Sequence, residues 1–355
     1  MIPLDSPLLA GNEKKYLNQC IDSNWISWQG EFVSKLEKDL AIYCQTKFCA
    51  SIVSGTNALI LALRALGIGP GDDVIVPTFT MSASCFAVTS VGANIVWVDT
   101  APNSLNSNAD EIKKKITENT KAIMVVHLYG TPVDVEAVNK IANGIPVIED
   151  AAESLGAEIN GRRVGGIGTI GIHSFHNKII GSGEGGAITT NDSKLFDRIL
   201  ALRVPAENND GGDILTLNNR MSNISAAVAC AQLENINELI FKRRYVANLY
   251  QQMYALTDLR TFKEESNCKN VYWRYQIQQT KVPIDKLCEA LKNKGIHARP
   301  VFKPMHKHKI YKSENTFPNA EYIASTTIDL PSGPAITDKE VFYVAKTVSS
   351  IIDAS

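Results

Sequence analysis

The chain contains 355 residues with a formal net charge of −1, and 45% of its residues are apolar, which is ordinary for a globular protein. Its length predicts one large and one small structural part. The balanced charge argues against a chain that binds nucleic acid or a membrane surface as a whole, and residues 1–16 lack the pattern of a signal peptide. We therefore expect a cytoplasmic protein with no nucleic-acid or membrane partner.

Predicted helices and apolar strands alternate along the first part of the chain. Two helices come first, over residues 12–23 and 31–44. Strands follow at 49–53, 73–77, 93–99, 121–130 and 145–150, with helical patterns at 58–67, 82–92 and about 134–143 between them. Strands that are almost wholly apolar are typical of a parallel sheet covered by helices on both faces. The pattern therefore predicts an α/β fold.

The pattern changes near residue 230. A long helical pattern covers residues 226–256, and a strand-like run at 270–279 and a helix ending at Gly295 follow it. We assign residues 1–230 to a large part and residues 231–355 to a bridging helix and a small α+β part.

The seven cysteines are scattered and contain no CxxC pair, so they predict neither a disulfide framework nor a metal site. Free thiols fit a reducing compartment. The cysteines are Cys20, Cys44, Cys49, Cys85, Cys230, Cys268 and Cys288.

Two glycine-rich stretches match the dinucleotide pattern GxGxxG, at residues 166–171 and 181–186. Neither clearly joins a strand to a helix, because an apolar strand-like run follows each of them. The residues therefore favour tight turns, in which glycine tolerates positive φ angles, over a nicotinamide-dependent oxidoreductase.

Three polar segments lie where predicted strands end. Ser54-Gly55-Thr56 separates a strand from a helix, where free N–H groups and a hydroxyl can hold a phosphate or can simply cap the helix. Asp150 ends a strand, so its carboxylate should point into the crevice of a parallel sheet. Lys178 precedes a glycine-rich turn, where its amine could act as a nucleophile or be an ordinary surface lysine.

Together these segments resemble one known family. The resemblance rests on the stretches SGTNALILALRALGIGPGDDVIVPTFT, IEDAAESLGA, GRRVGGIGTIGIHSFHNK and GEGGAITTND. They are similar to the DegT/DnrJ/EryC1/StrS sugar aminotransferases, which are fold-type I (aspartate aminotransferase-like) enzymes. The resemblance reaches RPVFKPMH at residues 299–306, and it implies a large domain with a mostly parallel sheet and a small α+β domain. Residues 1–32 resemble the perosamine synthase branch.

The resemblance also implies roles for particular residues. Lys178 would carry pyridoxal 5′-phosphate, and Asp150 would pair with the nitrogen of the pyridine ring and keep it protonated. Glu153 stands where Gln or Glu meets the ring hydroxyl. The other implied cofactor contacts are Gly55, Thr56 and Ser174 at the phosphate, Met81 over the ring, and Asn218, which would reach the phosphate of the neighbouring subunit in a homodimer with shared sites.

The implied reaction is amino transfer in two halves. An amino donor, expected to be L-glutamate, gives its amino group to the cofactor while Lys178 moves the proton. A nucleotide-linked keto-sugar then receives the amino group. The first candidate is GDP-linked 4-keto-6-deoxymannose, for O-antigen (lipopolysaccharide) or other surface polysaccharide. His306, Arg220 and Arg299 are candidate substrate contacts, with a surface histidine as the equal alternative for His306.

Two features depart from the family pattern. Ser174 and Lys178 are four positions apart, where many members have five, and Met81 stands where members usually place an aromatic ring. A thioether can also cover a ring face.

Other functions stay open. UDP- or dTDP-linked 4-keto-6-deoxyhexoses, or an oxidised octulosonate, would need similar core residues. A sugar dehydratase would carry histidine in place of Lys178, although His176 lies nearby in the sequence. A non-catalytic cofactor-binding regulator would carry an added nucleic-acid-binding module, and none is visible.

Overall fold

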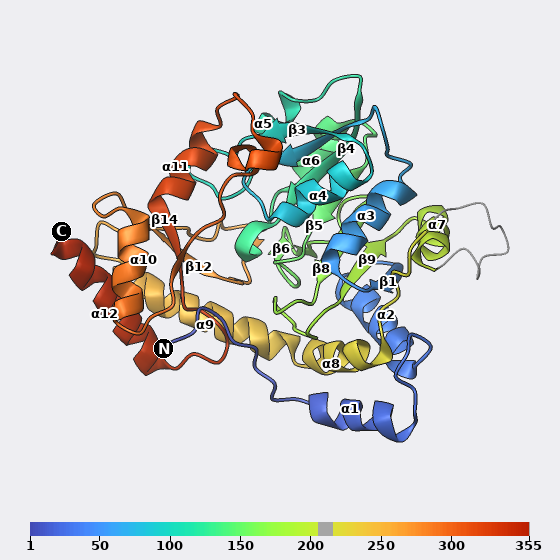
Figure 1. Cartoon of the computed structure of the whole chain (residues 1–355), viewed down its shortest axis with the longest axis horizontal. Helices are drawn as coiled ribbons and strands as arrows, with labels where there is room; N and C mark the ends of the chain where they lie inside the picture. Colours follow the sequence, from blue (N-terminus) through green and yellow to red (C-terminus); the bar gives the residue numbers. More distant parts are fainter. Residues whose placement is uncertain (205–215, 355) are drawn as a thin grey trace.

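The computed structural model describes residues 1–204 and 216–354, and a seven-stranded sheet forms the centre of its larger part (Figure 1). The strand order is β1-β9-β8-β5-β4-β2-β3. Only β9 runs against its neighbours, β1 and β8, so the predicted mostly parallel sheet is confirmed. Its strands are β1 (Phe48–Ile52), β2 (Asp73–Pro77), β3 (Asn94–Val98), β4 (Thr120–Val126), β5 (Val147–Asp150), β8 (Ile170–Ser174) and β9 (Gly186–Thr190).

Helices cover both faces of this sheet. Successive side chains of a strand point to opposite faces, and apolar residues here occupy both of them. Val74 and Met124 pack in one hydrophobic cluster with α3, α4 and α7, whereas Ile75 and Ile123 pack in another with α5 and α6. The helices of this part are α1 (Glu13–Asp22), α2 (Glu31–Tyr43), α3 (Gly55–Ala65), α4 (Ser82–Ser90), α5 (Ala109–Lys113), α6 (Val135–Ala142) and α7 (Ser193–Arg203).

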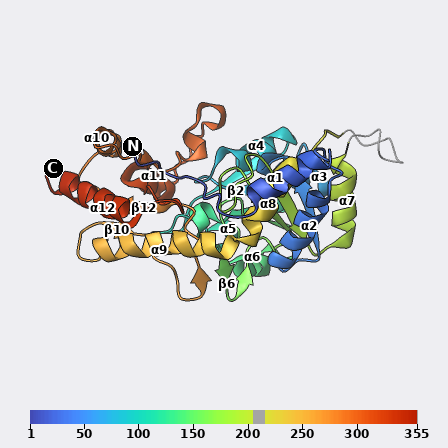
Figure 2. The ribbon, with the colours of Figure 1, turned by 90° about the horizontal axis from the view of Figure 1, so that it is seen from below.

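The single long helical pattern predicted over residues 226–256 is divided into two helices, α8 (Asn223–Glu234) and α9 (Ile236–Tyr254). Asn235 separates them, and its side-chain amide donates to the carbonyl of Ala231 (3.1 Å). An asparagine side chain that bonds to nearby backbone competes with the helical ladder. The helix α8 packs against α1 and α2, and α9 continues into the smaller part, where it packs against α12 (Figure 2).

The smaller part contains a four-stranded sheet in the order β10-β12-β14-β13, all antiparallel. The strand predicted at 270–279 begins only at residue 275, because Tyr272 has a positive φ of 47° and its N–H bonds to the Asn270 side chain (2.7 Å). The elements are β10 (Arg260–Thr261), β12 (Tyr275–Gln278), β13 (Arg299–Pro300), β14 (Thr327–Leu330), α10 (Ile284–Asn293), α11 (Pro318–Thr326) and α12 (Asp338–Asp353).

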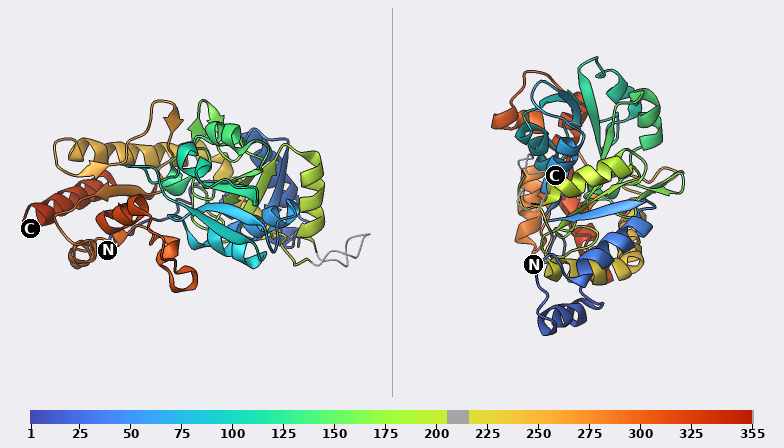
Figure 3. Two further views of the ribbon diagram at one scale, coloured as in Figure 1. Left: turned by 90° about the horizontal axis from the view of Figure 1, so that it is seen from above. Right: turned by 90° about the vertical axis from the view of Figure 1, so that its right-hand side faces the viewer.

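A third, three-stranded sheet joins two segments that are far apart in the chain. It has the order β11-β6-β7 and consists of β6 (Glu158–Ile159), β7 (Arg162–Arg163) and β11 (Cys268–Lys269). The first residues of the chain, which the sequence assigns to the large part, lie against the smaller one: Ile2 forms a bridge with Ile296. Both termini are therefore at the same end of the molecule (Figure 3). Among the described residues, no helix is both long and apolar enough to cross a bilayer.

Candidate active site

A cavity of about 250 Å³ lies where β5 and β8 end and α3 begins. This edge of the sheet carries the carboxyl ends of parallel strands, which is where α/β proteins bind ligands. The cavity brings together a lysine, a histidine, three carboxylates, three hydroxyl groups and a thioether. Its lining residues are Ser54, Gly55, Thr56, Leu59, Met81, Ala83, Val126, Leu128, Asp150, Ala152, Glu153, Ser174, His176, Lys178 and Glu184.

A larger cavity of about 460 Å³ in the smaller part has a different character. Two of its cations have partners within the chain: Lys281 pairs with Asp258 (3.1 Å), and Arg260 donates to the carbonyl of Asn103 (2.8 Å). The smaller cavity is therefore the better candidate for chemistry.

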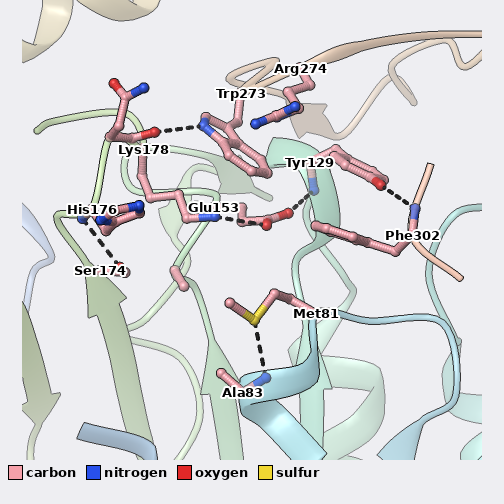
Figure 4. Close-up of polar contacts among 12 residues, drawn as sticks. Met81, Ala83, Tyr129, Glu153, Ser174, His176, Lys178, Trp273, Arg274 and Phe302 are labelled. Carbon is pink, nitrogen blue, oxygen red and sulfur yellow. Dashed lines mark hydrogen bonds and ion pairs between the residues drawn. The ribbon is translucent and has the colours of Figure 1, made fainter. Parts of the chain in front are cut away.

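Lys178 is held firmly in the smaller cavity. Its Nζ donates to Oε1 of Glu153 (3.0 Å) and lies 3.5 Å from the ring centroid of Trp273 (Figure 4). Its carbonyl accepts from the guanidinium of Arg243 (3.0 Å), which fixes the backbone from α9. Burial lowers the pKa of Lys178, and the neighbouring Glu153 opposes that shift. A lowered pKa brings the amine closer to the neutral form that acts as a nucleophile or a base.

Asp150 is a buried carboxylate whose two oxygens are both bonded. Oδ2 accepts from the hydroxyl of Ser84 (2.8 Å), which in turn lies 3.0 Å from the hydroxyl of Thr80, and Oδ1 accepts from the N–H of Ala152 (3.2 Å). Burial raises the pKa of Asp150, and the Ser84 hydrogen bond opposes the shift. A cationic group in the cavity would stabilise this carboxylate.

The beginning of α3 forms an anion cradle. Ser54 caps the helix through the N–H of Asn57 (3.2 Å), and Thr56 lines the cavity beside it. A Cβ atom at Gly55 would lie only 2.8 Å from Cβ of Ser174, so glycine is needed for the helix to approach β8 this closely. Helix N–H groups with nearby hydroxyls bind phosphate well.

The short spacing from Ser174 to Lys178 does not separate the two residues, because both line the cavity. Asn177, between them, has a positive φ of 41°, a conformation that asparagine adopts more readily than most residues. With this turn, the short segment from Ser174 to Lys178 places both side chains in the cavity.

Met81 also lines the cavity, with 40% of its surface exposed. Its sulfur accepts from the N–H of Ala83 (3.0 Å) at the beginning of α4 (Figure 4). The thioether therefore has a fixed position at the cavity wall, where the family usually has an aromatic ring.

The remaining predicted residues lie outside this cavity. Asn218 accepts from Nε of Arg220 (2.9 Å), and the Arg220 guanidinium stacks on Trp28 (4.6 Å). Arg299 pairs with Asp329 (3.2 Å) in the small sheet. Their arrangement in a single chain does not place them on a ligand in the cavity.

His306 is neither a surface histidine nor part of the cavity wall. Its ring is fully buried, with Nδ1 at 2.6 Å from the hydroxyl of Thr78 and Nε2 at 3.1 Å from Glu321. The surface alternative is therefore wrong, and both ring nitrogens are occupied within the chain.

Sequence reasoning missed an aromatic row at the cavity edge. Tyr129 stacks between Trp273 (centroids 6.1 Å apart) and Phe302 (5.1 Å), and the guanidinium of Arg274 lies 4.3 Å from the Trp273 ring centroid (Figure 4). The available signal was the cluster YWRY at 272–275, which the apolar pattern assigned to a strand. Ser84 was also missed, because its position on α4 gives no sign that it contacts Asp150.

The architecture and the sequence agree with known proteins. The model of the DegT/DnrJ/EryC1/StrS aminotransferase family matches residues 7–349. The chain belongs to this family. Like its relatives it is a sugar aminotransferase dependent on pyridoxal 5′-phosphate.

Three relatives illustrate the breadth of the match. GDP-perosamine synthase of Escherichia coli O157:H7 is 38% identical, with 98% of each chain covered. The dTDP-3-amino-3,6-dideoxy-alpha-D-galactopyranose transaminase of Aneurinibacillus thermoaerophilus is 34% identical, with 94% of this chain and 93% of the relative covered. A solved structure of a putative sugar aminotransferase from Streptococcus pneumoniae, in its PMP form, superposes with a TM-score of 0.92 at 25% identity and full coverage of both chains.

The cavity fits this cofactor chemically. An amine with a lowered pKa suits the aldehyde, a buried carboxylate suits a protonated pyridine nitrogen, and the cradle at α3 suits the phosphate. When bound, pyridoxal phosphate withdraws electrons from the carbon next to the transferred nitrogen.

Proposed function

We propose that this protein transfers the amino group of L-glutamate to a nucleotide-linked 4-keto-sugar, with GDP-4-keto-6-deoxymannose as the first candidate. The observation that carries the proposal is the joint placement of Lys178, Glu153 and Asp150 in one cavity beside the anion cradle. The 38% identity to a GDP-perosamine synthase supports the choice of sugar. The product would serve surface polysaccharide or O-antigen synthesis in the cytoplasm.

In this proposal each side chain has a separate task. Lys178 would carry a proton between the donor carbon and the cofactor, and Glu153, 3.0 Å from Nζ, can hold the amine in place. Asp150 would keep the pyridine nitrogen protonated. Gly55, Thr56 and Ser174 would hold the phosphate, and Met81 would cover one ring face.

A homodimer would bring further residues to the site. Asn218 and Arg220 lie beside the segment that carries Trp28, and the neighbouring Trp25 and Leu217 are more than half exposed. Large exposed apolar side chains that gather in one region are typical of an interface. Two copies packed on this surface would allow Asn218 and Arg220 to reach the partner's cavity. The substrate roles of Arg299 and His306 are less direct, since both side chains already have partners in the chain.

The first test is the variant Lys178→Ala. The purified wild-type protein should absorb visible light with pyridoxal phosphate bound, and the variant should lose both this band and all measurable turnover, because no other amine lines the cavity among the described residues. The exposed lysine variant Lys140→Ala is the control and should match the wild type. An unchanged spectrum and rate in Lys178→Ala would refute the assignment of this lysine.

The second test is a panel of keto-sugar nucleotides with L-glutamate, followed by release of 2-oxoglutarate. The GDP-linked 4-keto-6-deoxyhexose should give the highest kcat/KM. A higher value with a dTDP- or UDP-linked sugar would replace the substrate but keep the reaction class. The 34% identity to a dTDP-sugar transaminase makes this the specific second candidate.

A further inference from the structure

Trp273 lies two residues before β12 of the four-stranded sheet, yet its ring contacts the reactive amine at the edge of the seven-stranded one. Nζ of Lys178 lies 3.5 Å from the centroid of the indole ring, and only 3% of Trp273 is exposed. An ammonium group this close to an aromatic face is attracted by the negative charge of that face, and tryptophan forms the strongest contact of this kind. Figure 4 shows the amine within reach of both this ring and the carboxylate of Glu153.

Three hydrogen bonds tie Trp273 to the loop that carries Lys178. The indole Nε1–H donates to the carbonyl of Asn177 (3.2 Å). The buried guanidinium of Arg243 donates to the carbonyl of Trp273 (2.8 Å) and to that of Lys178 (3.0 Å). The contact between amine and ring is therefore built into the fold, because the two segments that supply these groups are themselves joined.

Tyr129 connects the two groups that hold the amine. Its backbone N–H donates to Oε2 of Glu153 (2.9 Å), and its ring stacks on Trp273 with an angle of 13° between the planes. Tyr129 has a positive φ of 56°, which is rare for a bulky residue. Residues in such strained conformations gather at functional sites, where the surrounding structure holds them in place. The amine, the carboxylate and the two rings thus form a closed circle of contacts (Figure 4).

The indole supports a positive charge without adding a negative one. Among the described residues, Glu153 is the carboxylate that pairs with Lys178. A second carboxylate would hold the amine in its charged form, whereas an aromatic face stabilises that form only modestly. A group that must take up a proton and give it back within one reaction needs such a balance.

We infer that Trp273 is a positioning residue for amino transfer, and that its ring face holds the charged amine of Lys178 while this amine carries the proton. The inference rests on the proposed function, in which Lys178 carries a proton between the donor carbon and the cofactor in each half of the reaction. A fixed position for the charged amine favours every such transfer. In this assignment Trp273 acts on the amine and on neither substrate.

The first test measures Lys178 in the cofactor-free protein. Acetylation of Lys178 by acetic anhydride is followed against pH by mass spectrometry, since only the neutral amine reacts. Trp273→Phe and Trp273→Leu both remove the indole N–H, but only Trp273→Leu removes the aromatic face. The pKa of Lys178 should be lower in Trp273→Leu than in Trp273→Phe, because the charged amine loses the support of a ring. An equal or higher pKa in Trp273→Leu would overturn the inference.

The second test measures the two half-reactions of the loaded enzyme. In Trp273→Leu the maximal rate of each half-reaction should fall about 3- to 30-fold, which is the range expected for loss of a cation–π contact. The KM values of the amino donor and of the keto-sugar should stay unchanged, and Trp273→Phe should recover most of the rate. Unchanged rates would overturn the inference. A rise in the KM of one substrate at an unchanged rate would overturn it too, and would make Trp273 a substrate contact.

The matched control is Trp97→Leu, which removes a partly buried tryptophan of β3 that meets Tyr311 edge-on (5.7 Å). It should leave the titration of Lys178 and both half-reactions as in the wild type. Urea unfolding should show that all variants are folded, and Trp273→Met offers a second side chain without an aromatic face. Absence of amino transfer in the wild type would refute the proposed function. The comparison of Trp273→Phe with Trp273→Leu in the cofactor-free protein would still decide whether the ring holds the charged amine.

Discussion

Two adjacent carboxylates at the end of β5 have opposite environments. Glu149 accepts hydrogen bonds from His127 (3.1 Å) and from the backbone N–H groups of Gly165 (2.7 Å), Ile167 (2.7 Å) and Gly168 (2.6 Å). Burial alone would raise the pKa of Glu149, but these hydrogen bonds lower it overall. Asp150 accepts two hydrogen bonds, and burial raises its pKa.

The difference shows how one strand supplies both structure and chemistry. Glu149 points to the face of the sheet on which it ties down the loop at 165–168, and its acceptor sites are saturated by the chain. Asp150 points into the cavity. Burial raises its pKa, and a cationic ligand beside it would stabilise the charged carboxylate. The alternation of side chains along a strand separates the two roles.

The largest effect is expected for Glu149→Gln. An amide in place of the carboxylate puts N–H groups against N–H groups and removes the charge that these donors stabilise. The free energy of unfolding should fall by about 3–5 kcal/mol, measured by urea denaturation. The surface variant Glu136→Gln, which loses only an exposed ion pair with Arg162, should remain within about 0.5 kcal/mol of the wild type. If Glu149→Gln were as stable as the wild type, the structural role inferred for this carboxylate would be refuted.

A smaller effect of a different kind is expected for Asp150→Asn. The rate of the first half-reaction should fall about 10²- to 10³-fold, because the side chain can no longer keep the pyridine nitrogen protonated. The stability of the cofactor-free protein should be kept or slightly raised, since the fold disfavours the charged form of Asp150. Single-turnover kinetics and urea denaturation together test the comparison, which fails if Asp150→Asn loses as much stability as Glu149→Gln.

The smallest effect concerns acid stability around His173, which lies near Glu149. Its ring is fully buried beside Cys44 (3.6 Å) and Thr189 (3.1 Å), and burial lowers the pKa of His173 to about 4. Between about pH 6.5 and pH 4 the unfolded chain binds a proton at this residue that the folded chain does not. Stability should therefore fall as the pH falls through this window, by up to about 3 kcal/mol.

The variant His173→Gln should show a flatter dependence of unfolding free energy on pH over the same window. His176→Gln is the matched control, because His176 is two-thirds exposed, and it should follow the wild type. Equal slopes for wild type and His173→Gln would place the acid sensitivity elsewhere.

The first five strands of the central sheet were accessible from the sequence, and so, with the help of the family resemblance, were the cavity residues Gly55, Asp150 and Lys178. Apolar runs bounded by glycine and proline identify buried strands, and polar residues at strand ends identify the ligand edge. His306 shows the limit of this reasoning. Its spatial neighbours Thr78 and Glu321 are distant from it in the sequence. No local sequence pattern therefore predicts that both of its ring nitrogens are hydrogen-bonded.

Arg274 and Trp273 could not be placed for a related reason. Their orientation depends on the left-handed conformation of Tyr272, which interrupts the strand that the apolar pattern predicts. Trp273 and Arg274 therefore precede β12 instead of lying within it.

The pairing of β1 with β9 has a consequence for the order in which the protein is made. Phe48 pairs with Thr190, and Gly55 packs on Ser174, so the anion cradle requires segments far apart in the chain. Arg243, which holds the carbonyl of Lys178, also pairs with Asp5 near the other end (3.3 Å). A chain that ends before Arg243 would therefore lack the contact that holds the carbonyl of the reactive lysine.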